Sequence, residues 1–201
     1  MPTEDLTLPL DGPVPNNPQP VRLSRAALKG KTPAQIEAHL RERGWTNAWR
    51  DGIYPFHHYH STAHEVLVIA RGQARLTLGG EGGPQVQVGE GDVLVLPAGT
   101  GHKNDGSSPD LLVIGAYAGG REWDLCRPEE TDVEAAQQRI AGVPDPERDP
   151  VSGEAWVEAG AIRAGNRSRF RSWVHLPAPA RSADPESATS GRRRSASARR
   201  R

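Results

Sequence analysis

Hydrophobic residues in the middle of the chain recur in short groups that predict β-strands. Apolar and polar residues alternate over 73–78 and 85–88, as in strands with one buried face. Nearly continuous apolar runs, also typical of short strands, cover 65–70, 92–96 and 111–117. Glycine-rich turns separate all these runs. Many short strands at nearly even spacing predict a mainly β fold, a barrel or jelly roll.

Two short helices are predicted to flank the strands. Thr32 is a suitable N-cap, a proline follows it, Gln35 completes a capping box, and Gly44 can end the helix. The second helix is expected over 131–141, with Glu134 in the capping-box position and a glycine after its last residue.

The rest of the chain suggests one domain with irregular ends. Residues 1–24 are rich in proline and asparagine, and we expect an irregular arm there. The folded domain is expected over 25–153, with its barrel at 50–117. An irregular basic segment then follows at 154–176. The remainder, 177–201, is rich in Arg, Ser, Ala and Pro, and we expect it to be disordered.

Charge and length limit the classes of partner. The net charge is zero at pH 7, but residues 154–201 contain eleven arginines against four acidic residues, so the folded part is mildly acidic. We therefore do not expect the domain to bind nucleic acid; the arginine clusters of the tail are interpreted as a solvated segment. The longest apolar stretch, 111–118, is far shorter than the ~20 residues that span a bilayer.

Cysteine usage and the first residues point to the cytoplasm. Cys126 is the single cysteine, which excludes an intrachain disulfide and a cysteine-based zinc site. The N-terminus lacks the basic and apolar regions of a signal peptide. We expect a cytoplasmic protein without a membrane segment.

Histidines provide the candidate chemistry. Four of the seven histidines lie within 57–64. In an extended strand His58 and His60 project to the same face, and His102 follows a later strand. Two imidazoles joined by a third and by a carboxylate form a mixed nitrogen and oxygen site that suits Mn, Fe, Co, Ni, Cu or Zn. A His-x-His pair alone is also common on solvated surfaces.

The spacing of these residues resembles the two signature motifs of the cupin superfamily. The chain matches every fixed position up to His102: Gly52-x5-His58-x-His60-x4-Glu65-x6-Gly72, then Gly91-x5-Pro97-x-Gly99-x2-His102. It departs once, at Gly106, where the family has an asparagine that is not a metal ligand. The resemblance covers about 50–117. A closer similarity to a group of uncharacterised small bacterial cupins extends through Trp45–Ser61, His64–Leu67 and Pro97–Asn104.

This resemblance implies a fold and a metal site. The implied fold is the cupin double-stranded β-helix, a jelly-roll barrel with short flanking helices. By the same resemblance one divalent transition metal ion is bound by His58, His60, Glu65 and His102. Four protein ligands leave one or two positions open for substrate, water or dioxygen on a five- or six-coordinate ion.

Further candidates surround these four residues. His57 and His64 could support the metal ligands or simply stabilise the fold. Tyr59 and Lys103, like Tyr54 and Arg75, could supply acid, base or anion contacts at the barrel mouth, or be ordinary rim residues.

Three functions remain open from the sequence. The leading hypothesis is a metal-dependent enzyme, an oxygenase or isomerase, that acts on a small polar molecule. Its rival is a non-catalytic cupin that binds a metabolite or metal as a sensor or store. A nucleic-acid-associated protein acting through the basic tail is the weakest reading. Because cupin barrels often pair through an edge strand, we also expect a homodimer.

Overall fold

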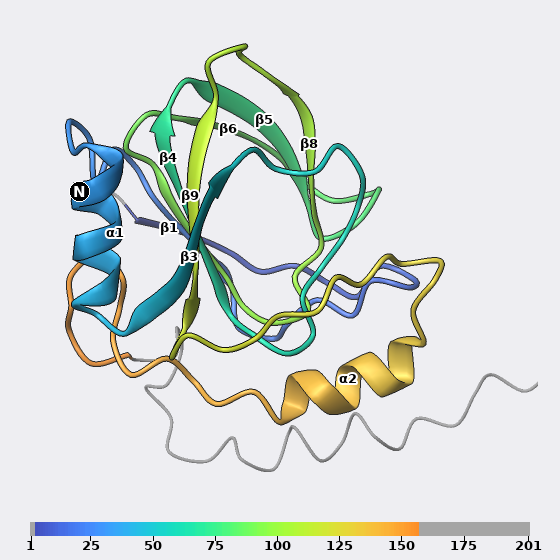
Figure 1. The fold of residues 1–201 in the computed structure, drawn as a ribbon. Coiled ribbons are helices and arrows are strands. Elements are labelled where there is room, and N and C mark those ends of the chain that lie inside the picture. The colour runs from blue at the N-terminus through green and yellow to red at the C-terminus, as the bar shows by residue number, and fades with distance from the viewer. Residues whose placement is uncertain (1–2, 157–201) are drawn as a thin grey trace, which may run out of the picture. The chain divides into compact units, whose positions relative to one another are not determined.

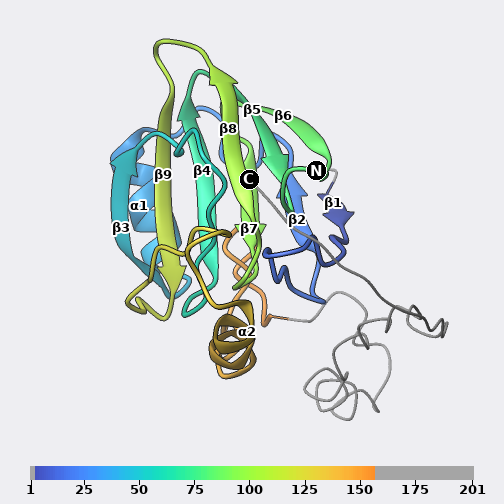
Figure 2. The same cartoon turned by 90° about the vertical axis from the view of Figure 1, so that its right-hand side faces the viewer.

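Two antiparallel sheets face each other in the computed structural model, which describes residues 3–156 of the chain. The larger sheet has the strand order β1-β2-β7-β4-β9-β3 and the smaller one β6-β5-β8 (Figures 1 and 2). The strands are β1 (Thr3–Leu6), β2 (Val21–Ser24), β3 (Trp45–Asp51), β4 (Glu65–Arg71), β5 (Gln73–Leu78), β6 (Gln85–Gly89), β7 (Val93–Leu96), β8 (His102–Ser107) and β9 (Leu112–Ala118). The predicted mainly β jelly-roll barrel is confirmed.

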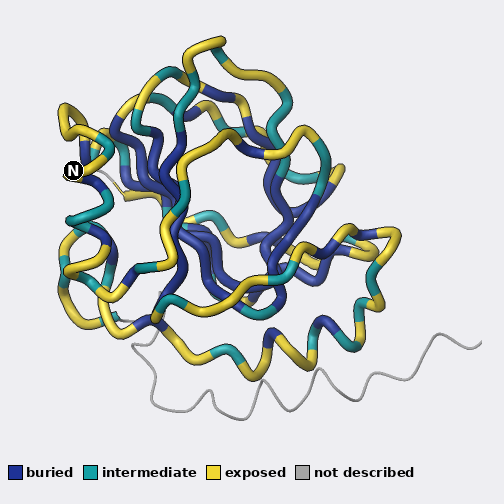
Figure 3. The backbone as a smooth tube through the Cα atoms, in the orientation of Figure 1, coloured by how far each residue is buried: buried dark blue, intermediate teal, exposed yellow. Residues whose placement is uncertain are grey.

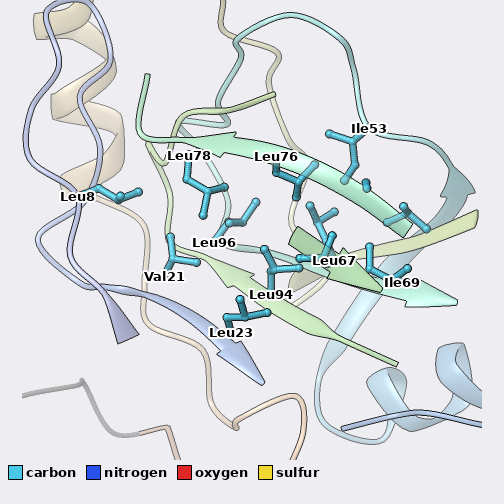
Figure 4. Packing of buried hydrophobic residues seen from close by; sticks show 13 residues of the cluster. Leu8, Val21, Leu23, Ile53, Leu67, Ile69, Leu76, Leu78, Leu94 and Leu96 are labelled. Carbon is cyan, nitrogen blue, oxygen red and sulfur yellow. The ribbon is translucent and has the colours of Figure 1, made fainter. Parts of the chain in front are cut away.

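The main core fills the space between the two sheets. Leucines of β4 and β7 meet leucines of β5 there, together with β2 residues such as Leu23 (Figure 4). On β4 the residues Leu67 and Ile69 face this interior, whereas Val66 and Val68 face the other side. Both faces of β4 are buried, which explains its nearly continuous apolar sequence (Figure 3).

The outer face of the larger sheet is covered by α1 (Pro33–Arg41). Ile36 and Leu40, one helical turn apart, pack there against the outward residues of β4, β7 and β9 (Figure 2). The predicted capping box is present: Thr32 Oγ1 accepts from the Gln35 backbone N–H at 3.3 Å, and Gln35 Oε1 accepts from the Thr32 N–H at 2.9 Å.

The second helix, α2 (Val133–Ala141), lies across one end of the barrel (Figure 1). It begins two residues later than predicted. Asp132 is the N-cap, because its carboxylate accepts hydrogen bonds from the backbone N–H groups of Glu134 and Ala135. Neither helix in the described part of the chain is long and apolar enough to cross a membrane.

The expected irregular arm at 1–24 is wrong in part. It contains β1 and β2, and β2 pairs with β7 in the register Leu23↔Leu94. Val21 and Leu23 are buried in the main core. Only four residues long, β2 is too short for its alternation to stand out among the neighbouring prolines.

Two other strands carry no apolar pattern. β3 contains two tryptophans among polar residues, and Asn47, with a φ of 55°, lies where its register with β9 shifts. β8 has the sequence His-Lys-Asn-Asp-Gly-Ser, without an apolar residue. Of the predicted C-terminal segments, 177–201 and all but the first three residues of 154–176 lie outside the described residues.

Candidate metal centre

Three buried histidines converge inside the barrel at the end nearer α2. His58 forms an isolated antiparallel bridge with His102, the first residue of β8, with N···O distances of 3.2 and 2.9 Å. His60 follows two residues later on the same extended segment. The potential ligand atoms of the three side chains lie within 4.8 Å of one another. This group could hold a metal ion, although the segment forms single bridges where a regular strand was expected.

Backbone carbonyls orient all three imidazole rings. His58 Nδ1 lies 3.1 Å from the Phe56 oxygen, His102 Nδ1 lies 3.0 Å from the Thr100 oxygen, and His60 Nδ1 bonds the Asp124 oxygen. A carbonyl can only accept, so each Nδ1 must carry the proton. In the neutral rings, each Nε2 is left as the lone-pair nitrogen, the form that binds metals.

Glu65, the first residue of β4, adds a carboxylate to the histidines. Its Oε1 lies 3.5 Å from His60 Nε2 and its Oε2 lies 3.4 Å from His102 Nε2. Donor atoms that share an ion at about 2.1 Å are separated by about 3.0–3.5 Å, so these distances fit a common metal. Glu65 Oε2 is also buried without a hydrogen-bond partner among the described residues. An uncompensated buried oxygen of this kind fits a ligand whose ion would satisfy it.

Burial and mutual charge shift the pKa values within the group. Burial, followed by the neighbouring His102, lowers the pKa of His58 to about 2. Burial likewise lowers the pKa of His102. Burial alone would raise the pKa of Glu65, but above all the charge of His60 and its hydrogen bond outweigh burial and lower that pKa. Glu65 in turn raises the pKa of His60 against the effect of burial. The site therefore presents an ionised carboxylate with neutral His58 and His102 at neutral pH.

His64 lies apart from this group, although it precedes Glu65 in the chain. Its ring is buried, and its Nδ1 accepts a hydrogen bond from the Ala98 backbone N–H at 3.0 Å. Ala98 belongs to the turn Pro97–Thr100, which leads directly into His102. His64 thus holds the turn before His102 and does not face the other histidines. Burial lowers its pKa to about 4.

Two other candidate residues also lie elsewhere. Tyr59 is fully buried and packs against Val14, Cys126 and Ala136. Lys103 follows His102 on β8, so its side chain leaves the opposite face and its Nζ lies 3.1 Å from the carboxylate of Asp105.

His57 precedes His58 in the chain but is not one of the three converging histidines. The ring is half-buried, and no hydrogen bond joins it to the converging histidines. Among the residues expected to support the ligands, none therefore contacts them through a hydrogen bond.

Aromatic residues surround the site, and of these only Tyr54 was a candidate from the sequence. Tyr117 of β9 pairs with Glu65 across the sheet, and its hydroxyl accepts a hydrogen bond from Trp49 Nε1 at 3.0 Å. Trp123 stacks on Tyr117 and lies edge-on to His60, with ring centres 5.1 Å apart. Tyr54 is edge-on to His58 at 5.1 Å. Because both faces of β9 are apolar and buried, the sequence pattern does not show that Tyr117 faces inward, and it does not place Trp123, which lies in a loop.

Known structures similar to this chain share little sequence with it. A DUF861 family protein from Thermotoga maritima is 20% identical, with a TM-score of 0.30, over 47% of this chain and 96% of that one. Acireductone dioxygenase from Bacillus anthracis, solved with a cadmium ion in its active centre, is 16% identical, with a TM-score of 0.34, over 48% of this chain and 77% of that one.

Sequence comparisons identify the family. The model of the cupin domain matches residues 51–114. The uncharacterised protein YjlB of Bacillus subtilis (strain 168) is 39% identical over 163 residues, which are 78% of this chain and 98% of the relative. The described β-barrel, with its inward histidines, agrees with this match. The chain belongs to the cupin family.

Proposed function

We propose that the chain binds one divalent transition metal ion through His58, His60, Glu65 and His102. The observation that carries this proposal is the common orientation of the three imidazoles. Each Nδ1 is taken by a backbone carbonyl, so the three Nε2 atoms are the nitrogens available to a single ion. Nitrogen and carboxylate ligands suit Mn, Fe, Co, Ni, Cu or Zn.

We further propose that this centre acts on a small polar molecule, as an oxygenase or isomerase. Four protein ligands leave coordination positions open, and a metal ion there would polarise a substrate oxygen or activate dioxygen. Tyr117 supports the proposal from the protein side. Its hydroxyl lies beside Glu65, and burial raises its pKa far above the usual value, so it stays protonated and can donate a hydrogen bond.

The rim of the site offers contacts to an incoming molecule. Tyr54 and Trp123 are 45% and 39% exposed, yet each touches the ring of a proposed ligand. Exposed aromatic side chains provide rigid apolar surfaces at low cost in conformational entropy. A small molecule that reaches the metal would therefore pass beside aromatic rings.

One observation favours a second candidate, a non-catalytic sensor or store. The four proposed ligands are each 6% exposed or less, so the centre is nearly closed to solvent. A protein that holds a metal or metabolite without turnover requires no more access than this. From the sequence we also propose that the protein is cytoplasmic and forms a homodimer.

A test for turnover by the metal-loaded protein distinguishes the enzyme from the non-catalytic sensor or store. The protein is loaded with Fe2+ or Mn2+ and incubated with a panel of small sugars, hydroxy acids and keto acids. Oxygen uptake and product formation are followed by electrode and NMR. We expect turnover of at least one compound, which Glu65→Gln abolishes and the exposed Glu90→Gln retains. Metal-dependent binding of compounds without any turnover would favour the sensor or store and contradict the enzyme.

A further inference from the structure

A polar cluster lies behind His60, on the side away from the converging nitrogens. Its centre is the carboxylate of Asp124, in the loop after β9. Asp124 Oδ1 accepts from the Ser61 backbone N–H at 2.6 Å, and Asp124 Oδ2 accepts from the Ser61 hydroxyl. Ser61 is fully buried and is the residue next to His60.

The same loop runs antiparallel to the histidine segment. Tyr59 and Cys126 exchange both backbone hydrogen bonds at 3.0 Å, and the Cys126 thiol donates to Asp124 Oδ2 at 3.2 Å. The Asp124 backbone N–H donates to Thr62 Oγ1 at 3.2 Å. Side-chain and backbone bonds together fix Asp124 against residues 59–62.

This arrangement brings one particular carbonyl to His60. The backbone oxygen of Asp124 accepts the His60 Nδ1 proton, so the residue that fixes the loop also supplies the atom that orients the ring. The corresponding carbonyls for His58 and His102 come from residues two positions earlier in the chain. His60 is therefore the one of the three rings whose orientation depends on a distant segment, 64 residues away.

Helix α2 completes the cluster. Arg139 Nε donates to the Ser61 hydroxyl at 2.6 Å and lies 3.5 Å from Asp124 Oδ2. The guanidinium thus balances the Asp124 charge and links α2 to both segments. Because hydroxyl, carboxylate and guanidinium are mutually bonded, the loss of one member loosens the others.

We propose that Asp124 is a positioning residue for His60, and that Arg139 secures it from α2. Asp124 acts through the loop: its carboxylate fixes the segment, and its carbonyl holds Nδ1 protonated and turns Nε2 toward the metal. This inference rests on the proposed function, because the positioned atom is a proposed ligand. It extends that function to residues outside the cupin motifs.

The first test needs no metal. In the metal-free, 15N-labelled protein, the His60 Nδ1 proton is expected to give an NMR signal that exchanges slowly with water. Asp124→Ala should abolish this protection, whereas Asp124→Asn, which keeps an oxygen acceptor for Ser61, should retain most of it. Glu90→Gln, in the exposed turn between β6 and β7, is the matched control for loss of a carboxylate.

The second test measures Ni2+ affinity by calorimetry. Asp124→Ala is expected to bind Ni2+ about 10–100-fold more weakly than the wild type, the usual effect of losing a group that orients a metal ligand. Asp124→Asn should lose less. Arg139→Met should weaken binding several-fold, which Arg41→Met, on the exposed side of α1, should not. If Asp124→Ala does not fold, the two arginine variants still decide the question.

Two outcomes would overturn the proposal. One is an Asp124→Ala protein that keeps the protected Nδ1 proton; the other is Ni2+ affinity in Asp124→Ala and Arg139→Met equal to that of the controls. A wild type that binds no metal would instead contradict the proposed function. In that case the proton signal would still decide whether Asp124 orients His60.

Discussion

Glu65 is the first residue of β4 and His64 precedes it, so their side chains leave the extended backbone on opposite faces. Glu65 shares its face with Leu67 and Ile69 inside the barrel, whereas His64 shares the other with Val66 and Val68. Both faces are apolar, so the hydrophobic pattern did not distinguish the two candidates. The motif spacing favoured Glu65, and its carboxylate does approach His60 and His102.

Exchanging each side chain for glutamine tests this difference. Glu65→Gln should weaken metal binding by at least about tenfold, because the neutral amide no longer offsets the charge of the ion. His64→Gln should change affinity much less, since its ring holds a turn. Calorimetric titration with Ni2+ measures both. A His64→Gln protein that loses the metal while Glu65→Gln retains it would mean that the ligand assignment is wrong.

The lowered pKa of His64 makes the free energy of unfolding depend on pH. Its pKa is about 4 in the folded protein and about 6.5 when unfolded, so only the unfolded chain takes up the proton between these values. Stability from this group is therefore complete above pH 6.5 and lost as the pH falls toward 4. The loss is up to about 3 kcal/mol.

Urea unfolding in the presence of a chelator measures this loss. Between pH 6.5 and 4 the free energy of unfolding should fall less steeply in His64→Gln than in the wild type. Glutamine carries no titratable group, yet its oxygen can accept the Ala98 N–H bond. Parallel curves for the two proteins would show that His64 does not resist protonation in the folded state.

Among the helices and strands, those with a clear local sequence pattern were predicted correctly. The alternation at Gln73–Leu78 and the capping box at Thr32 correspond to β5 and α1. β8 was not predicted, because its polar residues are held by pairing with β5. Lys103 and Tyr59 were candidates for the site, with ordinary rim positions as the alternative, because only their proximity in sequence to the histidines was visible. Asp124 was missed for the opposite reason, its distance in sequence from His60.

The N-terminal segment before β2 also contacts the turn that leads into His102 of the candidate metal centre. Asn16 is buried, and its amide donates to the backbone oxygens of Pro9 and Gly79. Its Oδ1 accepts from the Gly101 N–H at 3.1 Å, directly before His102. Residues expected to be an irregular arm therefore brace the start of β8.

Asn16→Ala should destabilise the metal-free protein by about 2–4 kcal/mol, because several buried backbone groups lose their partner. Asn47→Ala is the matched control, since both asparagines have left-handed backbones, with φ of 49° and 55°, but Asn47 is exposed. The control should lose about 1 kcal/mol, because its side chain makes one long, exposed hydrogen bond, to the Arg121 oxygen at 3.4 Å, and the rest of the effect is the change in backbone strain. Equal losses in urea unfolding would show that the Asn16 hydrogen bonds contribute nothing.

At the scale of the whole molecule, the chain extends well beyond the described residues. We predict that deleting 177–201 leaves the melting temperature and metal content unchanged, because that sequence has almost no large apolar residue. Thermal unfolding of the truncated and full-length proteins makes the comparison. A drop of several degrees would mean that the segment contributes to the fold.

The larger sheet ends in two edge strands, β1 and β3. Unpaired backbone groups on an edge strand can pair with a second copy of the chain, and on this basis we predict a homodimer. Light scattering should give twice the mass of the chain. The mass of a single chain across the accessible concentration range would contradict the prediction.

The metal content of the purified protein shows whether the proposed site binds an ion. The chain is purified without chelators, dialysed, and analysed for Mn, Fe, Co, Ni, Cu and Zn. Because the ligand atoms of His58, His60 and His102 lie within 4.8 Å of one another and the Glu65 carboxylate approaches two of these histidines, we predict about one ion per chain, summed over the six metals. Protein that contains none of these metals, and takes up none when each is supplied, would show that the three histidines and Glu65 do not form a metal site.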